Sequence, residues 1–407
     1  MKTLDLFIFV DALGWKQVQE RDFLADLLPL RNRCQTVFGY SSTCDPTILT
    51  GKMPDEHGHF SCFVRGTDAL PFRHFGKLAF LPQKLAGYHR VRNRLSRWLG
   101  KSLGYTGYFQ LYSVPFEHLQ HLDYTEKRDI YRAGGILGGQ EPIFELWERS
   151  GKSWARSDWH NPDKVNIAQM RDLIDRGETE LGYLFLGKPD AVMHQHGTRG
   201  AEVDAAFDQL ARDIRSLHEL AQKNYREVRF HVFSDHGMSD TCAASDLWPR
   251  WKRAFRHARY GRDYVAVWDS TMARFWFDDE SVRQEAHQFL SEAGDGGRIV
   301  SDEELGRWRC KFEGDRYGET FYLLSPGSIF APSFMNQSWV QGMHGYEPEH
   351  EDCDASWLTN AEGRHADHLV DIFPNMVAAS GQAAPDDANQ DPGSDPDTAP
   401  LLVGSEN

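Results

Sequence analysis

Acidic residues and histidines that could bind metal ions occur at four separated places in this 407-residue chain. Three carboxylates and three imidazoles suit divalent ions of hard to borderline character, above all zinc. Six ligands are too many for one tetrahedral zinc ion, but they are enough for two ions that share a nucleophile and a substrate. The candidate ligands are Asp11, Asp190, His194, Asp235, His236 and His344.

Taken one at a time, these residues have ordinary structural explanations. An Asp at the end of an apolar run, such as Asp11, commonly caps a turn or a helix. Asp190 and His194 are four residues apart, and any such pair on a solvated helix shares one face. His344 lies in a glycine-rich segment that is typical of a loop. Only the joint pattern points to a metal site.

Each of three short apolar runs is followed by an aspartate at its carboxyl end. Their length and continuous apolar character are typical of parallel strands that are covered on both faces. Neighbouring residues on a strand point to opposite faces, so Asp235 and His236 converge only where the strand has ended, and Gly237 eases that bend. The runs are residues 4–10, 182–186 and 228–233, followed by Asp11, Asp190 and Asp235.

The segment between the second and third runs predicts a helix. Its apolar residues, from Val203 to Ala221, step by three or four positions, as on one helical face. A strand, helix and strand in this order form a unit with parallel strands, and ligands then collect beyond the carboxyl ends of the strands. We therefore expect an α/β fold with a mostly parallel sheet and helices on both faces.

A cluster of hydroxyl groups lies within residues 40–51, YSSTCDPTILTG. One interpretation is a turn that caps a helix, with Asp45 as the cap and Pro46 as the first helical residue. The other is a nucleophile at a helix N-terminus, where free N–H groups face an anion and a nearby metal lowers the pKa of the hydroxyl. Both interpretations can hold together.

The order and spacing of these motifs resemble the alkaline phosphatase superfamily, and more closely its type I phosphodiesterase and nucleotide pyrophosphatase branch. In that family a Ser or Thr nucleophile lies nine residues before the Thr of a Thr-Gly step, which corresponds to Ser41 here, with Ser42 as its competitor. The resemblance covers residues 1–65, 180–240 and 340–380. The other matching residues are Asp11; Asp190, His194 and Gly197; Asp235, His236 and Gly237; and His344 and Gly345.

The resemblance implies a site with two divalent metal ions, zinc or alternatively manganese. It also implies that Ser41 attacks phosphorus and forms a seryl-phosphate, which water then hydrolyses. His196 is a further candidate for substrate contact, with an ordinary loop histidine as the alternative, and the same holds for His57 and His59. The implied ligand sets are Asp190, His194 and His344 for one ion, and Asp11, Asp235, His236 and Ser41 for the other.

The expected function is a metal-dependent phosphoester hydrolase, more a phosphodiesterase than a monoesterase. Cys44 occupies a place where family phosphodiesterases often have an Asn, and a thiol is a weak donor, which disfavours nucleotide pyrophosphatase activity. Thr43 and Asp45 stand where a sulfatase needs Pro and Arg. The alternatives are a phosphotransferase that passes the group to an alcohol or sugar, and a non-catalytic scaffold at a membrane surface.

Composition limits the partners and the compartment. A net charge of -15 disfavours nucleic acid as a partner. No apolar run is long enough to cross a membrane, and the N-terminal segment does not resemble a secretory signal, so we expect a cytoplasmic protein. The six cysteines contain no C-x-x-C pair and are expected to be reduced. The substrate would be a small-molecule or a lipid- or glycan-linked phosphoester.

We expect a catalytic domain over residues 1–380, with insertions at about 66–160 and 241–335, and an acidic, disordered tail over 381–407. The second insertion predicts strands at 264–268, 272–277 and 320–324 and a helix at 281–292. A closing helix at 367–377 would be shortened or kinked by Pro374. The basic residues between Arg90 and Lys101 form either a solvated helix face or a lid for an anionic or lipid-linked substrate.

Overall fold

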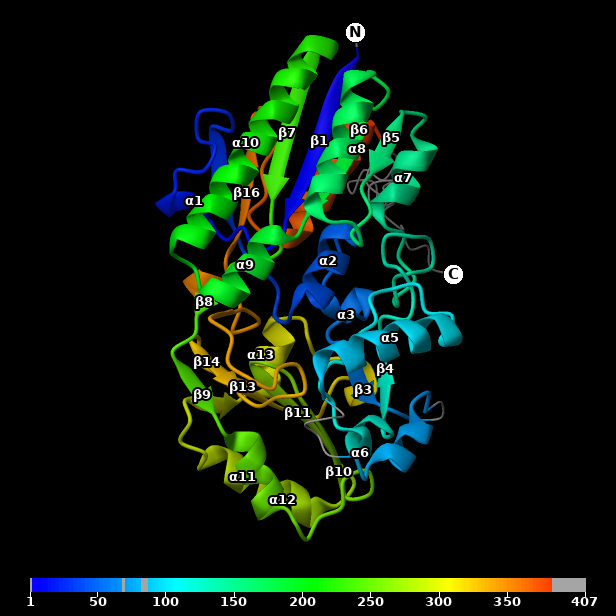
Figure 1. The fold of residues 1–407 in the computed structure, drawn as a ribbon, viewed down its shortest axis with the longest axis vertical. Helices are drawn as coiled ribbons and strands as arrows, with labels where there is room; N and C mark the ends of the chain where they lie inside the picture. Colours follow the sequence, from blue (N-terminus) through cyan, green and yellow to red (C-terminus); the bar gives the residue numbers. More distant parts are fainter. Residues whose placement is uncertain (1, 68–69, 82–86, 383–407) are drawn as a thin grey trace, which may run out of the picture.

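The computed structural model describes residues 2–67, 70–81 and 87–382. Its centre is a six-stranded sheet in the order β2-β16-β7-β1-β6-β5 (Figure 1). Strands β1, β5, β6 and β7 run parallel, and β16 is antiparallel to both of its neighbours. The predicted mostly parallel sheet is thereby confirmed. The strands are β1 (Thr3–Val10), β2 (Leu30–Cys34), β5 (Trp154–Arg156), β6 (Leu181–Leu186), β7 (Glu227–Phe233) and β16 (Ala355–Thr359).

Helices cover both faces of this sheet. Leu6 and Ile8 of β1 pack with α8 and α10 on one face, while Phe7 and Phe9 pack with α2, α7 and α14 on the other. Burial on both sides explains why the strand is apolar throughout. Helix α10 joins β6 to β7, as predicted. The helices are α2 (Ser41–Thr50), α7 (Ile143–Arg149), α8 (Asp163–Asp175), α9 (Lys188–His196), α10 (Ala201–Asn224) and α14 (Ile372–Ser380).

A second lobe lies beyond the carboxyl edge of the sheet, in the lower half of Figure 1. Its four-stranded antiparallel sheet has the order β10-β11-β13-β12. Three of these strands and one helix match the predicted elements closely. They are β10 (Tyr264–Trp268), β11 (Met272–Phe277), β13 (Thr320–Leu324) and α12 (Glu280–Ser291), and the fourth strand is β12 (Gly297–Ile299).

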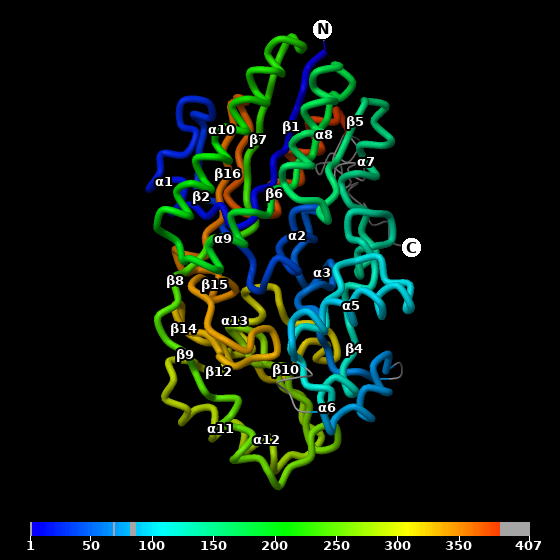
Figure 2. Tube along the Cα trace, in the orientation of Figure 1, coloured from blue at the N-terminus to red at the C-terminus, as the bar shows by residue number. Residues whose placement is uncertain are grey.

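The two segments predicted as separate insertions share one hydrophobic core. Phe72 and Phe116 of the first segment lie in the same buried cluster as Trp251 and Phe275 of the second. Figure 2 shows the two segments side by side in the lobe. The other elements here are β3 (Phe63–Arg65), η1 (Arg73–Leu78), α5 (His89–Leu103), α6 (Phe116–Leu119), β4 (Leu122–Tyr124), α11 (Leu247–Ala254) and α13 (Asp302–Arg307). Among the described helices, none has the length and apolar character needed to cross a membrane.

Some boundaries differ from the predictions. Strand β5 pairs with β6, so the central sheet reaches into the segment 66–160 that was expected to be an insertion. The closing helix α14 begins only at Ile372, so that Pro374 lies in its first turn. Amides of the first turn have no partner within the helix, so the missing N–H of Pro374 costs no hydrogen bond there. Of the tail expected over residues 381–407, only Gly381 and Gln382 lie within the described residues.

The structure contradicts the interpretation in which Asp45 caps the helix of the hydroxyl cluster. Helix α2 begins at Ser41, because the carbonyl of Tyr40 already accepts hydrogen bonds from the amides of Thr43 and Cys44. Asp45 is therefore not the cap, and Pro46 lies inside the helix. The expectation that the candidate nucleophile stands at a helix N-terminus agrees with this geometry.

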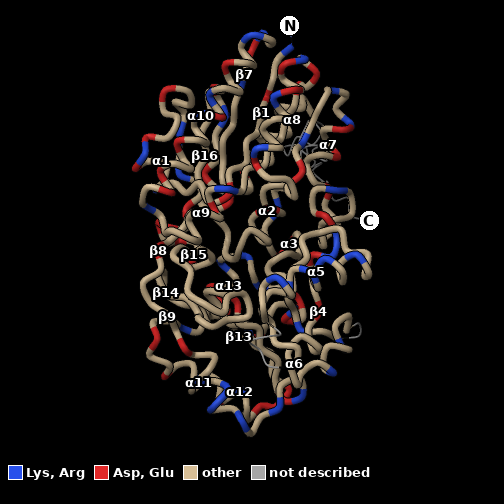
Figure 3. Tube along the Cα trace, viewed as in Figure 1, with Lys and Arg blue, Asp and Glu red and all other residues tan. Residues whose placement is uncertain are grey.

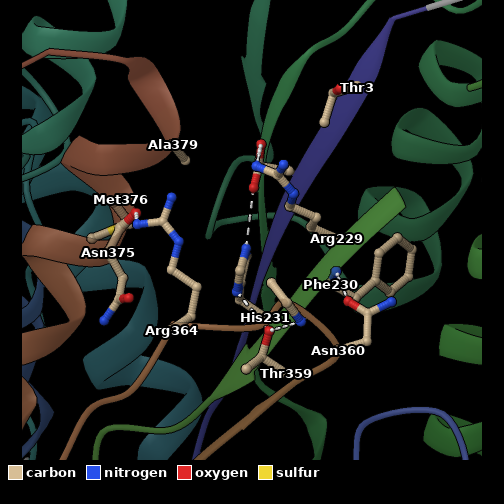
Figure 4. Close-up of polar contacts among 12 residues, drawn as sticks. Thr3, Arg229, Phe230, His231, Thr359, Asn360, Arg364, Asn375, Met376 and Ala379 are labelled. Carbon is tan, nitrogen blue, oxygen red and sulfur yellow. Dashed lines mark hydrogen bonds and ion pairs between the residues drawn. The ribbon is translucent and has the colours of Figure 1, made fainter. Parts of the chain in front are cut away.

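A buried polar network links three strands of the central sheet (Figure 4). Nδ1 of His231 on β7 lies 2.9 Å from Oγ1 of Thr359 on β16, and Nε2 lies 3.3 Å from Oδ1 of Asp5 on β1. Burial lowers the pKa of His231, whose ring stacks on Phe7. These side chains are buried away from the surface, so the network fixes neighbouring strands rather than contacting a substrate.

Candidate active site

Three strands of the central sheet end at the same level. The register pairs Val10 of β1 with Leu186 of β6, and Phe9 with Phe233 of β7. The residues that follow the three strands therefore meet at one edge, beside the second lobe (Figure 1). Those residues are Asp11, Asp190 in the first turn of α9, and the pair Asp235 and His236.

His344 reaches this edge through a short pairing of two strands. Strand β8 (Ser239–Asp240) follows closely after His236, and β15 (Gly342–Met343) immediately precedes His344. The two strands pair antiparallel, with Met343 opposite Ser239. The imidazole rings of His236 and His344 consequently stack with their centroids 3.7 Å apart.

Backbone carbonyls orient two of the imidazoles. Nδ1 of His194 lies 2.8 Å from the carbonyl of Gly342, and Nδ1 of His236 lies 2.9 Å from the carbonyl of Gly237. When each Nδ1–H donates to its carbonyl, the lone pair of each Nε2 is left to face the carboxylates, which is the usual arrangement of a metal-binding histidine.

The carboxylates lie close to these nitrogens. Nε2 of His194 is 3.2 Å from Oδ1 of Asp190, which is also 3.7 Å from Nε2 of His344. Nε2 of His236 is 2.9 Å from Oδ2 of Asp235. The candidate ligands therefore form one continuous cluster.

Within the described residues, two groups are compact enough to hold a cation, with ligand atoms within 4.8 Å of one another. His236 belongs to both groups, so two cation positions would be adjacent. The second group agrees with the set implied by the resemblance, whereas the first contains His236 in place of the expected His194. The groups are Asp190, His236 and His344, and Asp11, Asp235 and His236.

Charge repulsion inside the cluster favours a cation. Burial, followed by the charges of Asp190 and Asp235, raises the pKa of Asp11 well above its usual value. Burial also opposes the charged forms of the histidines, yet Asp190 raises the pKa of His194 and Asp235 raises the pKa of His236. Burial and the charge of His236 lower the pKa of His344.

Several buried atoms of the cluster have no hydrogen-bond partner, because the Nε2 atoms that face Asp190 and Asp235 carry no hydrogen when each Nδ1–H donates to its carbonyl. Each unsatisfied buried polar atom costs about 1–3 kcal/mol, so a set of them at one place calls for a ligand. Carboxylate and imidazole donors suit zinc or manganese, and the residues therefore fit divalent metal ions. The atoms are Asp11 Oδ1, Asp190 Oδ1, Asp235 Oδ2 and His344 Nδ1.

The two candidate serines are directed differently. Ser41 is the first residue of α2, and its Oγ lies 3.2 Å from Nε2 of His236. Ser42 instead donates a hydrogen bond of 3.0 Å to the carbonyl of Phe60. Of the two hydroxyls, only that of Ser41 contacts the ligand cluster.

The remaining candidate histidines lie elsewhere. His196 is exposed at the end of α9, and no contact joins it to the described ligands. Nε2 of His57 lies 2.9 Å from Oγ1 of Thr47, and Nε2 of His59 accepts a hydrogen bond from the amide of Leu137. His57 and His59 are thus buried side chains that hold local structure, not an extension of the cluster.

Three residues near the cluster were missed by sequence reasoning. The ring of Tyr40 packs edge-on against His344 at 5.8 Å. Asp45, one turn after Ser41, has its pKa raised by burial and then by the charge of Asp235. Burial raises the pKa of Glu126 to about 8, and the charge of Glu126 in turn raises the pKa of Asp45. The spacing of Asp45 from Ser41 was a usable signal, but no motif marks Glu126.

A mostly parallel sheet with helices on both faces, and with carboxylates and histidines gathered at its carboxyl edge, is the architecture of the alkaline phosphatase superfamily, which comprises metal-dependent phosphoester hydrolases. Residues 8–347 match the type I phosphodiesterase / nucleotide pyrophosphatase family, and the chain belongs to this family. Its members are phosphoric ester hydrolases.

Solved structures with a similar fold include ectonucleotide pyrophosphatase / phosphodiesterase 5 from mouse and human. The murine protein is 15% identical, with a TM-score of 0.63, and the alignment covers 94% of this chain and 96% of that chain. The human protein is 14% identical, with a TM-score of 0.64 and the same coverage. An inactive murine variant in complex with AMP is 15% identical, also with a TM-score of 0.64 and that coverage. A search of curated proteins found no match.

Proposed function

We propose that the protein is a phosphodiesterase in which Ser41 is the nucleophile beside two divalent metal ions, with zinc as the expected metal. The observation that carries the proposal is the contact of 3.2 Å between the Ser41 hydroxyl and His236, the residue shared by both candidate ligand groups. A hydroxyl in this position would be next to both ions.

The ligand sets follow from the geometry and the resemblance together. Asp190, His194 and His344 would hold one ion. The other would be held by Asp11, Asp235, His236 and the oxygen of Ser41. Three carboxylates and one alkoxide then balance the charge of two divalent ions.

The protein's residues have distinct roles in the proposed reaction. The ions would supply positive charge that lowers the pKa of the Ser41 hydroxyl and stabilises charge on the phosphoryl oxygens. The Ser41 oxygen attacks phosphorus in line, and the bond to one alkoxide leaving group breaks. The phosphoryl group, which still carries its second ester, stays on Ser41, and the proton lost from the Ser41 hydroxyl passes through solvent to the departing alkoxide. Water then attacks phosphorus and releases Ser41. The N–H groups at the start of α2 face the incoming anion.

A phosphodiester whose leaving group is not a nucleotide is the substrate class that we favour. Sγ of Cys44 lies 3.5 Å from Oγ1 of Thr36, and the side chain is part of the hydrophobic core with Ile48. Burial raises the pKa of this thiol, so it stays neutral. A buried thiol that faces Thr36 cannot supply the strong hydrogen bond of an Asn amide to a phosphoryl oxygen.

Turnover of bis(p-nitrophenyl) phosphate by metal-loaded protein tests the proposal. The variant Ser41→Ala should lose at least about a thousandfold in kcat while keeping its metal. The matched variant Ser42→Ala should retain most of the activity, because the Ser42 hydroxyl donates to the carbonyl of Phe60 and not to the ligand cluster. Full activity in Ser41→Ala would refute the assigned nucleophile. Analysis of products with and without an added alcohol would show whether the group passes to water or to an acceptor.

A further inference from the structure

The first part of the second lobe is strongly basic in a protein that is acidic overall. Residues 69–116 contain no Asp or Glu, although the whole chain has a net charge of -15. Such a separation of charge on one polypeptide creates a local positive potential. The basic residues of this stretch are Arg73, Lys77, Lys84, Arg90, Arg92, Arg94, Arg97 and Lys101.

Helix α5 carries half of these residues on its outer side. Its inner side is fixed in the lobe, since the guanidinium of Arg92 lies over the ring of Phe116 at 4.1 Å and the amide of Leu111 donates to Oγ of Ser96. Gly100 leaves room for the ring of Phe109 on the same side. The outer side carries four exposed basic residues: Arg90, Arg94, Arg97 and Lys101.

Large apolar side chains are exposed among these charges. Trp98 is 65% exposed and Val91 is 49% exposed. They are seven residues apart and therefore lie on one line along the helix, next to Arg94. Two large apolar side chains beside four cations give this face an amphipathic character that a purely solvated face lacks. We call Arg90, Val91, Arg94, Arg97, Trp98 and Lys101 the α5 outer face.

The charges of the α5 outer face have no acidic partner in the part of the chain that the structure describes. Elsewhere in the chain many arginines form ion pairs, such as Arg215 with Asp26 and Arg149 with Glu141. Among the described residues, no acidic side chain forms an ion pair with Arg90, Arg94, Arg97 or Lys101. In Figure 3, α5 is marked by blue Lys and Arg positions.

We propose that the α5 outer face binds the surface of an anionic lipid bilayer. Four cations that lack acidic partners among the described residues complement anionic headgroups. Trp98 and Val91 would enter the interface between headgroups and acyl chains, where the amphipathic indole ring is favoured. The aliphatic side chain of Val91 offers no ring on which a base could stack, so its exposure beside Trp98 favours a bilayer over nucleic acid.

Sedimentation with lipid vesicles tests this inference, and it does not depend on hydrolytic activity. The full-length protein should bind vesicles of phosphatidylcholine with phosphatidylserine and should not bind vesicles of phosphatidylcholine alone. The double variant Arg94→Glu with Arg97→Glu should weaken binding on the order of tenfold or more. Added salt should weaken binding of the unmodified protein as well.

A matched charge reversal provides the control. Arg253 and Arg256 are exposed at the end of α11, away from α5. Arg253→Glu with Arg256→Glu changes the net charge equally and should leave vesicle binding within about twofold. Trp98→Ser should weaken binding while leaving the melting temperature unchanged, because the side chain is exposed.

Three results would overturn the inference. The first is absence of binding to anionic vesicles, and the second is an equal loss of binding in the two double variants. The third is tighter binding of the protein to a single-stranded oligonucleotide than to vesicles, with that binding lost in Arg94→Glu with Arg97→Glu. The last result would assign the face to nucleic acid instead.

Discussion

The imidazole rings of His236 and His344 stack at 3.7 Å with an interplanar angle of 13°. The two residues come from different segments, one after β7 and the other after β15. Two stacked rings cannot both carry a positive charge without strong repulsion, and the pKa of His344 is accordingly lowered by burial and by His236. This contact joins the two candidate ligand groups into one site.

Metal affinity should depend on pH. The pKa values of His194 and His236 are raised by Asp190 and Asp235, in spite of burial. Metal binding must displace these protons, so the affinity should fall by up to about tenfold per pH unit for each displaced proton as the pH drops below these pKa values. Zinc titration against a competing chelator over a range of pH measures this slope. An affinity that does not change with pH would contradict it.

Gly237→Ala should weaken metal binding. A Cβ atom at this position would lie 2.2 Å from the carbonyl oxygen of Asp352, so the loop must shift and carry His236 with it. We expect a loss of about 1–3 kcal/mol in the free energy of unfolding and a lower metal content. Gly306→Ala on α13 is the matched control, because nothing lies within 4 Å of its added Cβ. Equal metal content in both variants would refute this prediction.

Glu126→Gln should remove a pH-dependent loss of stability. Burial raises the pKa of Glu126 to about 8, so the folded protein holds a proton that the unfolded chain releases at lower pH. The stabilising effect of this proton is complete below the unfolded pKa of about 4.3 and is lost as the pH rises toward 8. Between about pH 5 and pH 7 the unmodified protein should lose roughly 2–3 kcal/mol relative to Glu126→Gln.

Urea unfolding of both proteins at the two pH values measures that difference. The comparison between protein and variant cancels the contribution of other titrating groups. A difference in stability that is the same at both pH values would show that Glu126 titrates normally.

Tyr40→Phe should lower stability by about 1–2 kcal/mol. The Tyr40 hydroxyl accepts a hydrogen bond of 3.1 Å from the amide of Thr271 and lies 2.8 Å from its Oγ1, which ties α2 to the second lobe. Tyr88→Phe is the control, since Tyr88 is 54% exposed. Equal free energies of unfolding for the two variants would count against a structural role for the Tyr40 hydroxyl.

Local sequence patterns were sufficient to predict much of the central sheet. Strands β1, β6 and β7 are buried on both faces, so they are continuous apolar runs, and the acids that follow them stand at one edge. Strands β2 and β16 were not predicted. The sequence of β2, LRNRC, is polar and only partly buried, whereas β16 is fully buried but only five residues long. Their pairing depends on distant residues, which periodicity does not reveal.

The candidate site was predictable in its residues but less so in its arrangement. His344 arrives through the pairing of β8 with β15, which are only two residues each and carry no sequence signal of their own. The shared core of the two predicted insertions likewise depends on contacts between segments far apart in the chain. The burial of Glu126 also depends on long-range packing, so no sequence motif could predict it.

X-ray diffraction near the zinc absorption edge, from crystals of zinc-loaded protein, tests the central claim most directly. The account predicts two anomalous peaks about 4 Å apart, one in contact with Asp190 and His344 and the other between Asp235 and the Ser41 hydroxyl. A single peak, or peaks that lie away from Ser41, would contradict it.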